Sequence, residues 1–98
     1  MSGTGRLIWF EEAVQDIARL RLFLETKNPR AARRAARCIL DGAKMLQHHP
    51  EAGAPMGDGR RELFLPFGDS AYVLRYRLDG DDVLIIRVWH GREQRHDE

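Results

Sequence analysis

The feature that most constrains the fold is the short break Lys27-Asn28-Pro29, which separates two stretches with helical periodicity. Its asparagine is a favourable N-cap, and its proline is tolerated in the first turn of a helix. The pattern predicts one helix over residues 11–26 and a second over residues 29–48. Because the connection between them is so short, the two helices are predicted to pack as a hairpin.

Each predicted helix has one apolar face, which we expect to be buried. The first face consists of Ala13, Ile17, Leu20 and Leu24, and the second of Ala32, Ala36, Ile39, Ala43 and Leu46. Leu22 and Phe23 lie off the first face, so this helix has either a second contact surface or a wide core stripe. Arg30, Arg33, Arg34 and Arg37 form a basic stripe opposite the second face. Such a stripe is either a solvated face or a docking surface.

The remaining chain predicts strands and turns. We expect strands at residues 6–10, 61–66, 71–78 and 83–90, with a loop at 50–59 and a hairpin turn at 79–82. The order β-α-α-β-β-β predicts an α+β fold in which a helical hairpin covers one face of an antiparallel sheet. At 98 residues the chain is expected to be one domain, 1–98, with flexible ends at 1–5 and 94–98.

Alternation along the last two strands predicts which residues share a face of the sheet. The apolar sets, expected to face the helices, are Tyr72, Leu74, Tyr76 and Leu78, with Leu84, Ile86 and Val88. The opposite face then gathers Arg75, Arg77, Arg87 and Trp89, which predicts either a platform for an anionic target or a solvent face neutralised by nearby acids. Arg87 interrupts an apolar strand, so it must reach water or hold an anionic partner.

Charge and composition argue against several classes of protein. The net charge is +1, which gives no bulk affinity for polyanions, and lysine occurs only at Lys27 and Lys44. No apolar run is long enough for a membrane span or a signal sequence, so a cytoplasmic location without membrane association is expected. Cys38 is the only cysteine. The histidines form no spaced ligand set, so we expect no metal and no cofactor.

His90 lies at the end of the last predicted strand. Histidine is the side-chain type that ordinarily changes its charge near neutral pH. His90 could act as a general acid or base, or it could anchor the end of the strand through a hydrogen bond. Arg92 follows it closely.

The chain resembles bacterial toxins of the ParE/RelE superfamily from type II toxin–antitoxin systems, and within it the ParE-like, plasmid-stabilisation branch. The matching segments, in order, are Trp9, Asn28-Pro29 with Ala31-Ala32, Leu46 with Pro50 and Gly53, Arg61-Glu62-Leu63, Tyr72 to Arg77, and Ile86 to Glu93. They span nearly the whole chain, and the last one is the most specific. Phe10 departs from the family, which often has a serine or threonine cap there.

The resemblance implies one of two targets. ParE-like members inhibit DNA gyrase, which would make Arg75, Arg77, Arg87, Trp89, His90 and Arg92 candidates for target binding. RelE-like members cut mRNA on the ribosome, which would assign catalysis to Arg61, Arg75, Arg87 and His90. No lysine follows Lys44, although RelE-like members carry lysines before the second strand, so we expect a gyrase inhibitor and no enzyme.

The resemblance also implies a cognate, ParD-like antitoxin that folds on binding to the toxin. Its expected docking residues are Leu22, Phe23, Arg30, Arg34 and Arg37. A member that retains only antitoxin binding, without toxicity, is a third possibility.

Overall fold

A computed structural model describes residues 5–93. In chain order it contains β1 (Leu7–Trp9), α1 (Glu11–Glu25), α2 (Pro29–His48), β2 (Ala54–Pro55), β3 (Arg60–Phe67), β4 (Ser70–Asp79) and β5 (Asp82–His90). The predicted order β-α-α-β-β-β is confirmed, with β2 as a two-residue addition inside the expected loop. The flexibility expected at 1–5 and 94–98 falls outside the described residues except at Gly5, whose carbonyl accepts a hydrogen bond from the Gln47 side chain at 2.9 Å.

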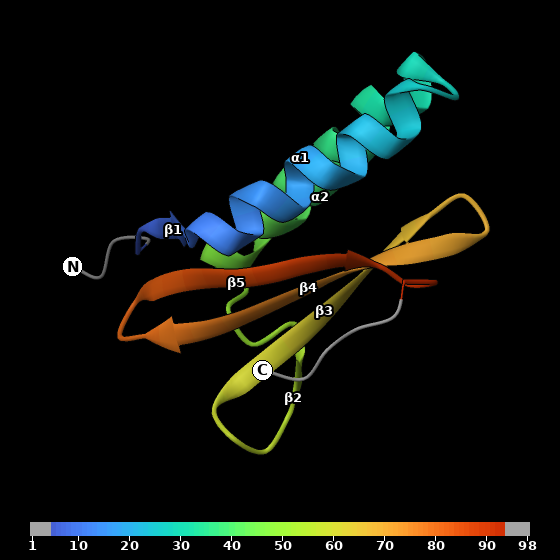
Figure 1. The fold of residues 1–98 in the computed structure, drawn as a ribbon. Helices are drawn as coiled ribbons and strands as arrows, with labels where there is room; N and C mark the ends of the chain where they lie inside the picture. Colours follow the sequence, from blue (N-terminus) through green and yellow to red (C-terminus); the bar gives the residue numbers. More distant parts are fainter. Residues whose placement is uncertain (1–4, 94–98) are drawn as a thin grey trace.

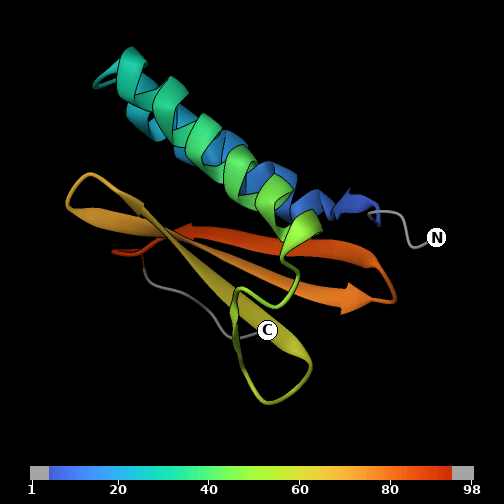
Figure 2. The ribbon, with the colours of Figure 1, turned by 180° about the vertical axis from the view of Figure 1, so that it is seen from behind.

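The five strands form one mixed sheet in the order β1-β5-β4-β3-β2. The last four strands in the chain pair antiparallel, as predicted, but β1 pairs parallel to β5, with Leu7 opposite Val83 and Trp9 opposite Ile85. Figures 1 and 2 show the two helices side by side across one face of the sheet. The α+β prediction is therefore confirmed, while the wholly antiparallel sheet is corrected to a mixed one.

The connection between the helices follows the predicted chemistry. The Asn28 side chain accepts hydrogen bonds from the backbone N–H groups of Arg30 and Ala31 at 3.1 and 3.2 Å. It thereby satisfies two of the donors that a helix start leaves unpaired. Further along α2, a Cβ atom at Gly42 would lie 2.6 Å from the Leu65 side chain. The glycine therefore allows α2 to approach β3 closely.

The core lies between the helical hairpin and the sheet. Its fully buried members are Ala13, Leu20, Ala35, Ile39, Ala43 and Leu46 from the helices and Tyr72, Leu74, Tyr76, Val83, Ile85 and Val88 from the strands. The predicted helix faces are largely confirmed, although Ala35 is buried more deeply than Ala36. Small residues dominate the α2 face, and they bring its backbone near the sheet.

The prediction of which β5 residues face the helices is wrong for Leu84 and Ile86. Arg75 pairs with Arg87 but the next residue, Tyr76, pairs with Ile85, so Ile86 forms a bulge. One extra residue in β5 moves all the side chains that precede it in this strand to the opposite face of the sheet. Val83 and Ile85 therefore enter the core together with Val88. Arg87 and Trp89, beyond the bulge, remain opposite Arg75 and Val73 on the outer face.

Candidate functional site

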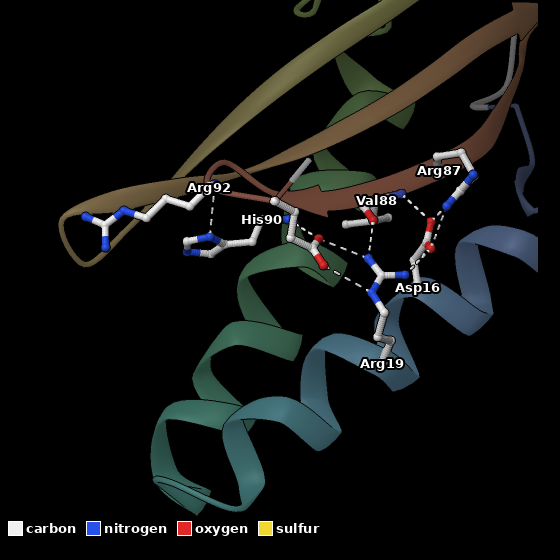
Figure 3. A network of polar contacts seen from close by, with 7 residues as sticks. Asp16, Arg19, Arg87, Val88, His90 and Arg92 are labelled. Atoms are coloured by element: carbon white, nitrogen blue, oxygen red, sulfur yellow. Dashed lines mark hydrogen bonds and ion pairs between the residues drawn. The ribbon is translucent and has the colours of Figure 1, made fainter. Parts of the chain in front are cut away.

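The centre of the site is the edge of β5 that β1 leaves uncovered. Pairing with β1 ends at Ile85, whose carbonyl accepts from the N–H of Phe10 at 2.9 Å. Beyond it, side chains of α1 take the place of a neighbouring strand. The Asp16 carboxylate accepts from the Val88 N–H at 2.8 Å, and Arg19 donates to the Val88 carbonyl at 3.4 Å. The carboxylate of Asp16 and the guanidinium of Arg19 thereby cover the exposed edge of the strand (Figure 3).

Asp16 also binds the arginine that the sequence singled out. Arg87 donates to the Asp16 carboxylate from Nε at 2.8 Å and from Nη2 at 3.1 Å, and Arg19 donates from Nη1 at 2.6 Å. The Asp16 residue is only 2% exposed. The predicted requirement that Arg87 hold an anionic partner or reach water is met by the partner.

The protonation of Asp16 follows from these contacts. Burial alone raises the pKa of its carboxyl group, because it disfavours the charged form. The hydrogen bonds from Arg87, the Val88 N–H and Arg19 outweigh burial and hold this pKa below its ordinary value. Asp16 is therefore a carboxylate across the neutral range, and it neutralises cations inside the fold.

The network continues to the end of the described chain through Glu93. Its carboxylate accepts from Arg19 at 3.0 and 3.2 Å and from the His90 N–H at 2.9 Å. His90 Nδ1 in turn accepts from the Arg92 N–H at 3.1 Å. Residues 90–93 are thereby bent back toward α1. One nitrogen of the His90 ring is engaged in holding this turn, in agreement with the anchoring role considered for it.

On the outer face, Arg75 is a buried cation. It is 3% exposed and donates to Glu62 from Nε at 3.0 Å and from Nη2 at 2.8 Å. Its guanidinium carbon lies 4.6 Å from the centre of the Trp89 ring, and that of Arg87 lies 5.3 Å from it. The structure thus brings Arg75, Arg87 and Trp89 together as predicted, but as a packed stack that contains its own carboxylates.

The residues considered for RNA cleavage do not converge. Arg61 is opposite Tyr76 on the helix-facing side, where it donates to the carbonyls of Glu51 and Gly53 at 3.2 and 2.7 Å. His90 packs edge-on against Tyr72 of the core, with ring centres 5.4 Å apart. Arg75 and Arg87 lie beyond the bulge on the other face of the sheet. The four groups are therefore divided between two faces.

A hollow of about 610 Å³ opens between α1, the β3–β4 turn and the end of β5. Its apolar wall includes Leu20, Phe23, Leu24, Phe67 and Tyr72, and its rim carries Arg19, His90, Arg92, Asp69 and Glu93. Leu22 and Phe23 are 64% and 61% exposed. Of the other predicted site residues, Arg77 is exposed in β4, and Arg92 lies at the rim with its guanidinium 3.2 Å from Asp69.

Sequence reasoning did not single out Asp16, Arg19 or Glu93. A signal for Asp16 was present, since it lies at helical spacing from Ala13 and Leu20 on the apolar face. An acid in that position indicates a buried cationic partner. Within residues 5–93, no helix is long and apolar enough to cross a membrane. The same residues contain no group of three or more His, Cys, Asp and Glu side chains placed to hold a metal ion.

The arrangement of helical hairpin and sheet is shared with a solved structure. The structure superimposes on one titled "Chromosomal ParDE TA system from P. aeruginosa" with a TM-score of 0.74 and 24% sequence identity. The match covers 91% of this chain and 98% of the other. It shows a shared fold.

Sequence comparison gives the family. A family model described as the ParE toxin of the type II toxin–antitoxin system parDE matches residues 7–95. Two relatives from Caulobacter vibrioides, named Toxin RelE1 and Toxin RelE3, are 43% and 40% identical over 83 residues. The matches cover 85% of this chain and 89% and 90% of the relatives. The chain belongs to the ParE toxin family within the ParE/RelE superfamily, and it is the toxin component of a type II toxin–antitoxin system. Membership implies a cognate antitoxin as its partner.

Proposed function

We propose that this toxin acts as a ParE-like inhibitor of DNA gyrase and that its antitoxin silences it. The observation that carries the proposal is the separation of the candidate ribonuclease residues. Cleavage of RNA requires cations and a proton-transfer group around one phosphate. Here Arg61 and His90 lie on the helix-facing side, whereas Arg75 and Arg87 lie on the outer face.

The electrostatics of the outer face support the same conclusion. Arg75 faces Glu62 and Arg87 faces Asp16, so carboxylates within the fold already occupy both guanidinium groups. Binding of a phosphate there would have to displace an internal acid. A toxin that acts by binding a protein target needs no such rearrangement. Gyrase is cytoplasmic, and so, by this proposal, is the toxin.

The hollow beside α1 supports a docking site for the antitoxin. It combines an apolar wall with a charged rim, which is the composition expected where an amphipathic segment folds on binding. Phe23 lines the hollow, and Leu22, which precedes it in α1, is exposed. We propose that a ParD-like antitoxin buries both side chains there. The sequence also assigned Arg30, Arg34 and Arg37 to the antitoxin interface, but none of them lines this hollow.

A ribosome-dependent mRNA endonuclease is the second candidate, and one observation favours it. The two Caulobacter relatives are named RelE1 and RelE3. In this case the target-bound toxin would have to break the pairs Arg75–Glu62 and Arg87–Asp16 and bring His90 to the same phosphate. A protein that retains antitoxin binding without toxicity is the third candidate.

Induced expression without antitoxin separates these candidates. Filamentation with a DNA-damage response and intact mRNA is the result that we expect. Rapid arrest of translation with cut mRNA would overturn the proposal, and then His90→Ala and Arg87→Ala should abolish the cleavage. Absence of any growth effect, from a protein that binds the antitoxin in a separate assay, would identify the third candidate.

A further inference from the structure

The outer face of α2 carries four arginines that have no carboxylate partner in the described part of the chain. Arg30, Arg33, Arg34 and Arg37 are exposed, and the structure records no ion pair or side-chain hydrogen bond for them within residues 5–93. Seven other arginines in the same part of the chain pair with carboxylates: Arg6, Arg19, Arg21, Arg60, Arg75, Arg87 and Arg92. The arginine stripe, defined as these four α2 residues, is therefore unlike most of the protein's positive charge.

The arginine stripe works against the helix that carries it. Arg30 lies in the first turn of α2, where the helix dipole disfavours a cation, and the other three follow within the N-terminal half of the helix. They also form like-charged pairs three and four positions apart, which destabilise a helix. In contrast, α1 begins with Glu11 and Glu12, as the dipole favours. A pattern that opposes its own helix indicates that an external anion relieves it.

The spacing of the stripe suits a regular row of phosphates. Arg30 and Arg37 are separated by seven residues, or about 10 Å at a helical rise of about 1.5 Å per residue. Each strand of duplex DNA carries one phosphate per roughly 3.4 Å of its axis. We propose that the arginine stripe of α2 binds the phosphate backbone of duplex DNA.

The side chains around the stripe favour a duplex over other anionic partners. The neighbouring positions Ala31, Ala32, Ala35 and Ala36 are alanines, and the first exposed large apolar residue after the stripe is Leu40. A peptide that folds on binding needs apolar anchors to offset its ordering, and the stripe provides none. Single strands are bound by stacking on aromatic rings, and α2 contains no Phe, Tyr or Trp. A duplex is already ordered and needs only charge.

This inference goes beyond the proposed function, because it concerns a surface of the toxin whether or not gyrase is the target. It also separates two surfaces that the sequence assigned to one partner. Leu22 and Phe23 remain assigned to the antitoxin, whereas Arg30, Arg34 and Arg37 are reassigned to DNA. The proposal assigns the four guanidinium groups to phosphates and not to base edges, so the binding is expected to be independent of DNA sequence.

The test is fluorescence anisotropy of the full chain with a labelled duplex of about 25 base pairs, between about 50 and 200 mM salt. The variant Arg33→Gln/Arg34→Gln removes two stripe charges. The control Arg6→Gln/Arg21→Gln removes two exposed arginines that have carboxylate partners elsewhere, at the same change in net charge. Antitoxin affinity and melting temperature are measured for all three proteins.

The expected result is a salt slope lower by about two for the stripe variant, with at least a tenfold loss of affinity at about 100 mM salt. The control should lose less than about threefold, and the stripe variant should keep its melting temperature and antitoxin affinity. Equal losses in both variants would reduce the effect to bulk charge and overturn the proposal. So would tighter binding of a single strand than of the duplex. A loss of antitoxin affinity with DNA binding intact would assign the stripe to the antitoxin.

Discussion

Arg87 in β5 and Arg34 in α2 carry the same guanidinium group in opposite surroundings. Arg87 donates twice to a carboxylate that is 2% exposed, while Arg34 lies exposed, and no carboxylate of residues 5–93 pairs with it. The first arginine binds the carboxylate that closes the edge of β5, and the second has its charge available to a partner. The comparison teaches that a cluster of arginines marks a binding surface only where the fold provides no matching acids.

The two ends of β5 show what the internal pairs accomplish. At Val83–Ile85 the strand edge is covered by β1, through backbone hydrogen bonds. At Val88 the same edge is covered by Asp16 and Arg19, which bond to the N–H and the carbonyl as a strand would. The charges of Arg87 and Asp16 are therefore part of the sheet's construction.

Replacement of Asp16 should have the largest effect on stability among the changes that test the contrast between Arg87 and Arg34. Asp16→Asn keeps the shape of the side chain but leaves Arg87 and Arg19 without their shared carboxylate. Loss of one member of a buried ion pair costs about 3 to 5 kcal/mol, and we expect a decrease of that size in the free energy of unfolding in urea.

The matched control is Glu12→Gln, an exposed carboxylate in the first turn of the same helix. It should cost no more than about 1 kcal/mol, the usual value of a surface charge at a helix start. Equal losses for Asp16→Asn and Glu12→Gln would contradict a structural role for the pair with Arg87.

Low pH should remove the contribution of Asp16 to the free energy of unfolding. Because the pKa of its carboxyl is lower in the folded protein than in the unfolded chain, its stabilisation is present above the unfolded value of about 3.9 and is lost as pH falls toward the folded value. We expect the stability difference between wild type and Asp16→Asn to be constant from about pH 7 to 5 and to shrink below about pH 4.

The pKa values of Asp58 and Asp82 are also lowered, mainly by hydrogen bonds from Arg60 and Arg6. Both carboxyl groups are present in wild type and variant, so their effects cancel in the difference. A difference that persists undiminished at about pH 2.5 would show that Asp16 does not act through its charge.

The smallest effect on stability is expected from substitutions in the arginine stripe of α2. Arg33→Gln/Arg34→Gln removes like-charged pairs from the helix, each of which costs about 0.2 to 0.5 kcal/mol. Thermal unfolding should therefore occur at the same temperature or slightly above it. A clear decrease in melting temperature would show that these arginines support the fold, and the contrast with Arg87 would disappear.

Some of this arrangement is readable from the sequence. The asparagine and proline at 28–29 predict the helical hairpin because their local chemistry determines both helix ends. The interruption of an apolar strand by Arg87 predicts either contact with water or an anionic partner, and the structure shows the partner. The bulge at Ile86 leaves no such signal, because one inserted apolar residue changes the phase of a strand without changing its composition. Asp16 could be suspected on its apolar face, but its partner depends on where β1 ends beside β5.

The division of the site between two faces of the sheet also depends on strand register, which the sequence does not show. Alternation predicts that Arg75, Arg87 and Trp89 share a face, and the register confirms it. The position of Arg61 and His90 on the other side follows from pairing with Tyr76 and Tyr72, which becomes known only with the register of three strands. Closeness in sequence to Arg75 and Arg87 therefore does not show that a residue lies beside them in the fold.

Supercoiling of relaxed plasmid DNA by purified gyrase, titrated with the purified toxin, tests the central claim most directly. The account predicts that the toxin inhibits supercoiling, that added antitoxin restores it, and that mRNA on purified ribosomes stays intact at the same toxin concentration. Unimpaired supercoiling together with cleaved mRNA would contradict the claim and would require the internal pairs of Arg75 and Arg87 to open on the ribosome.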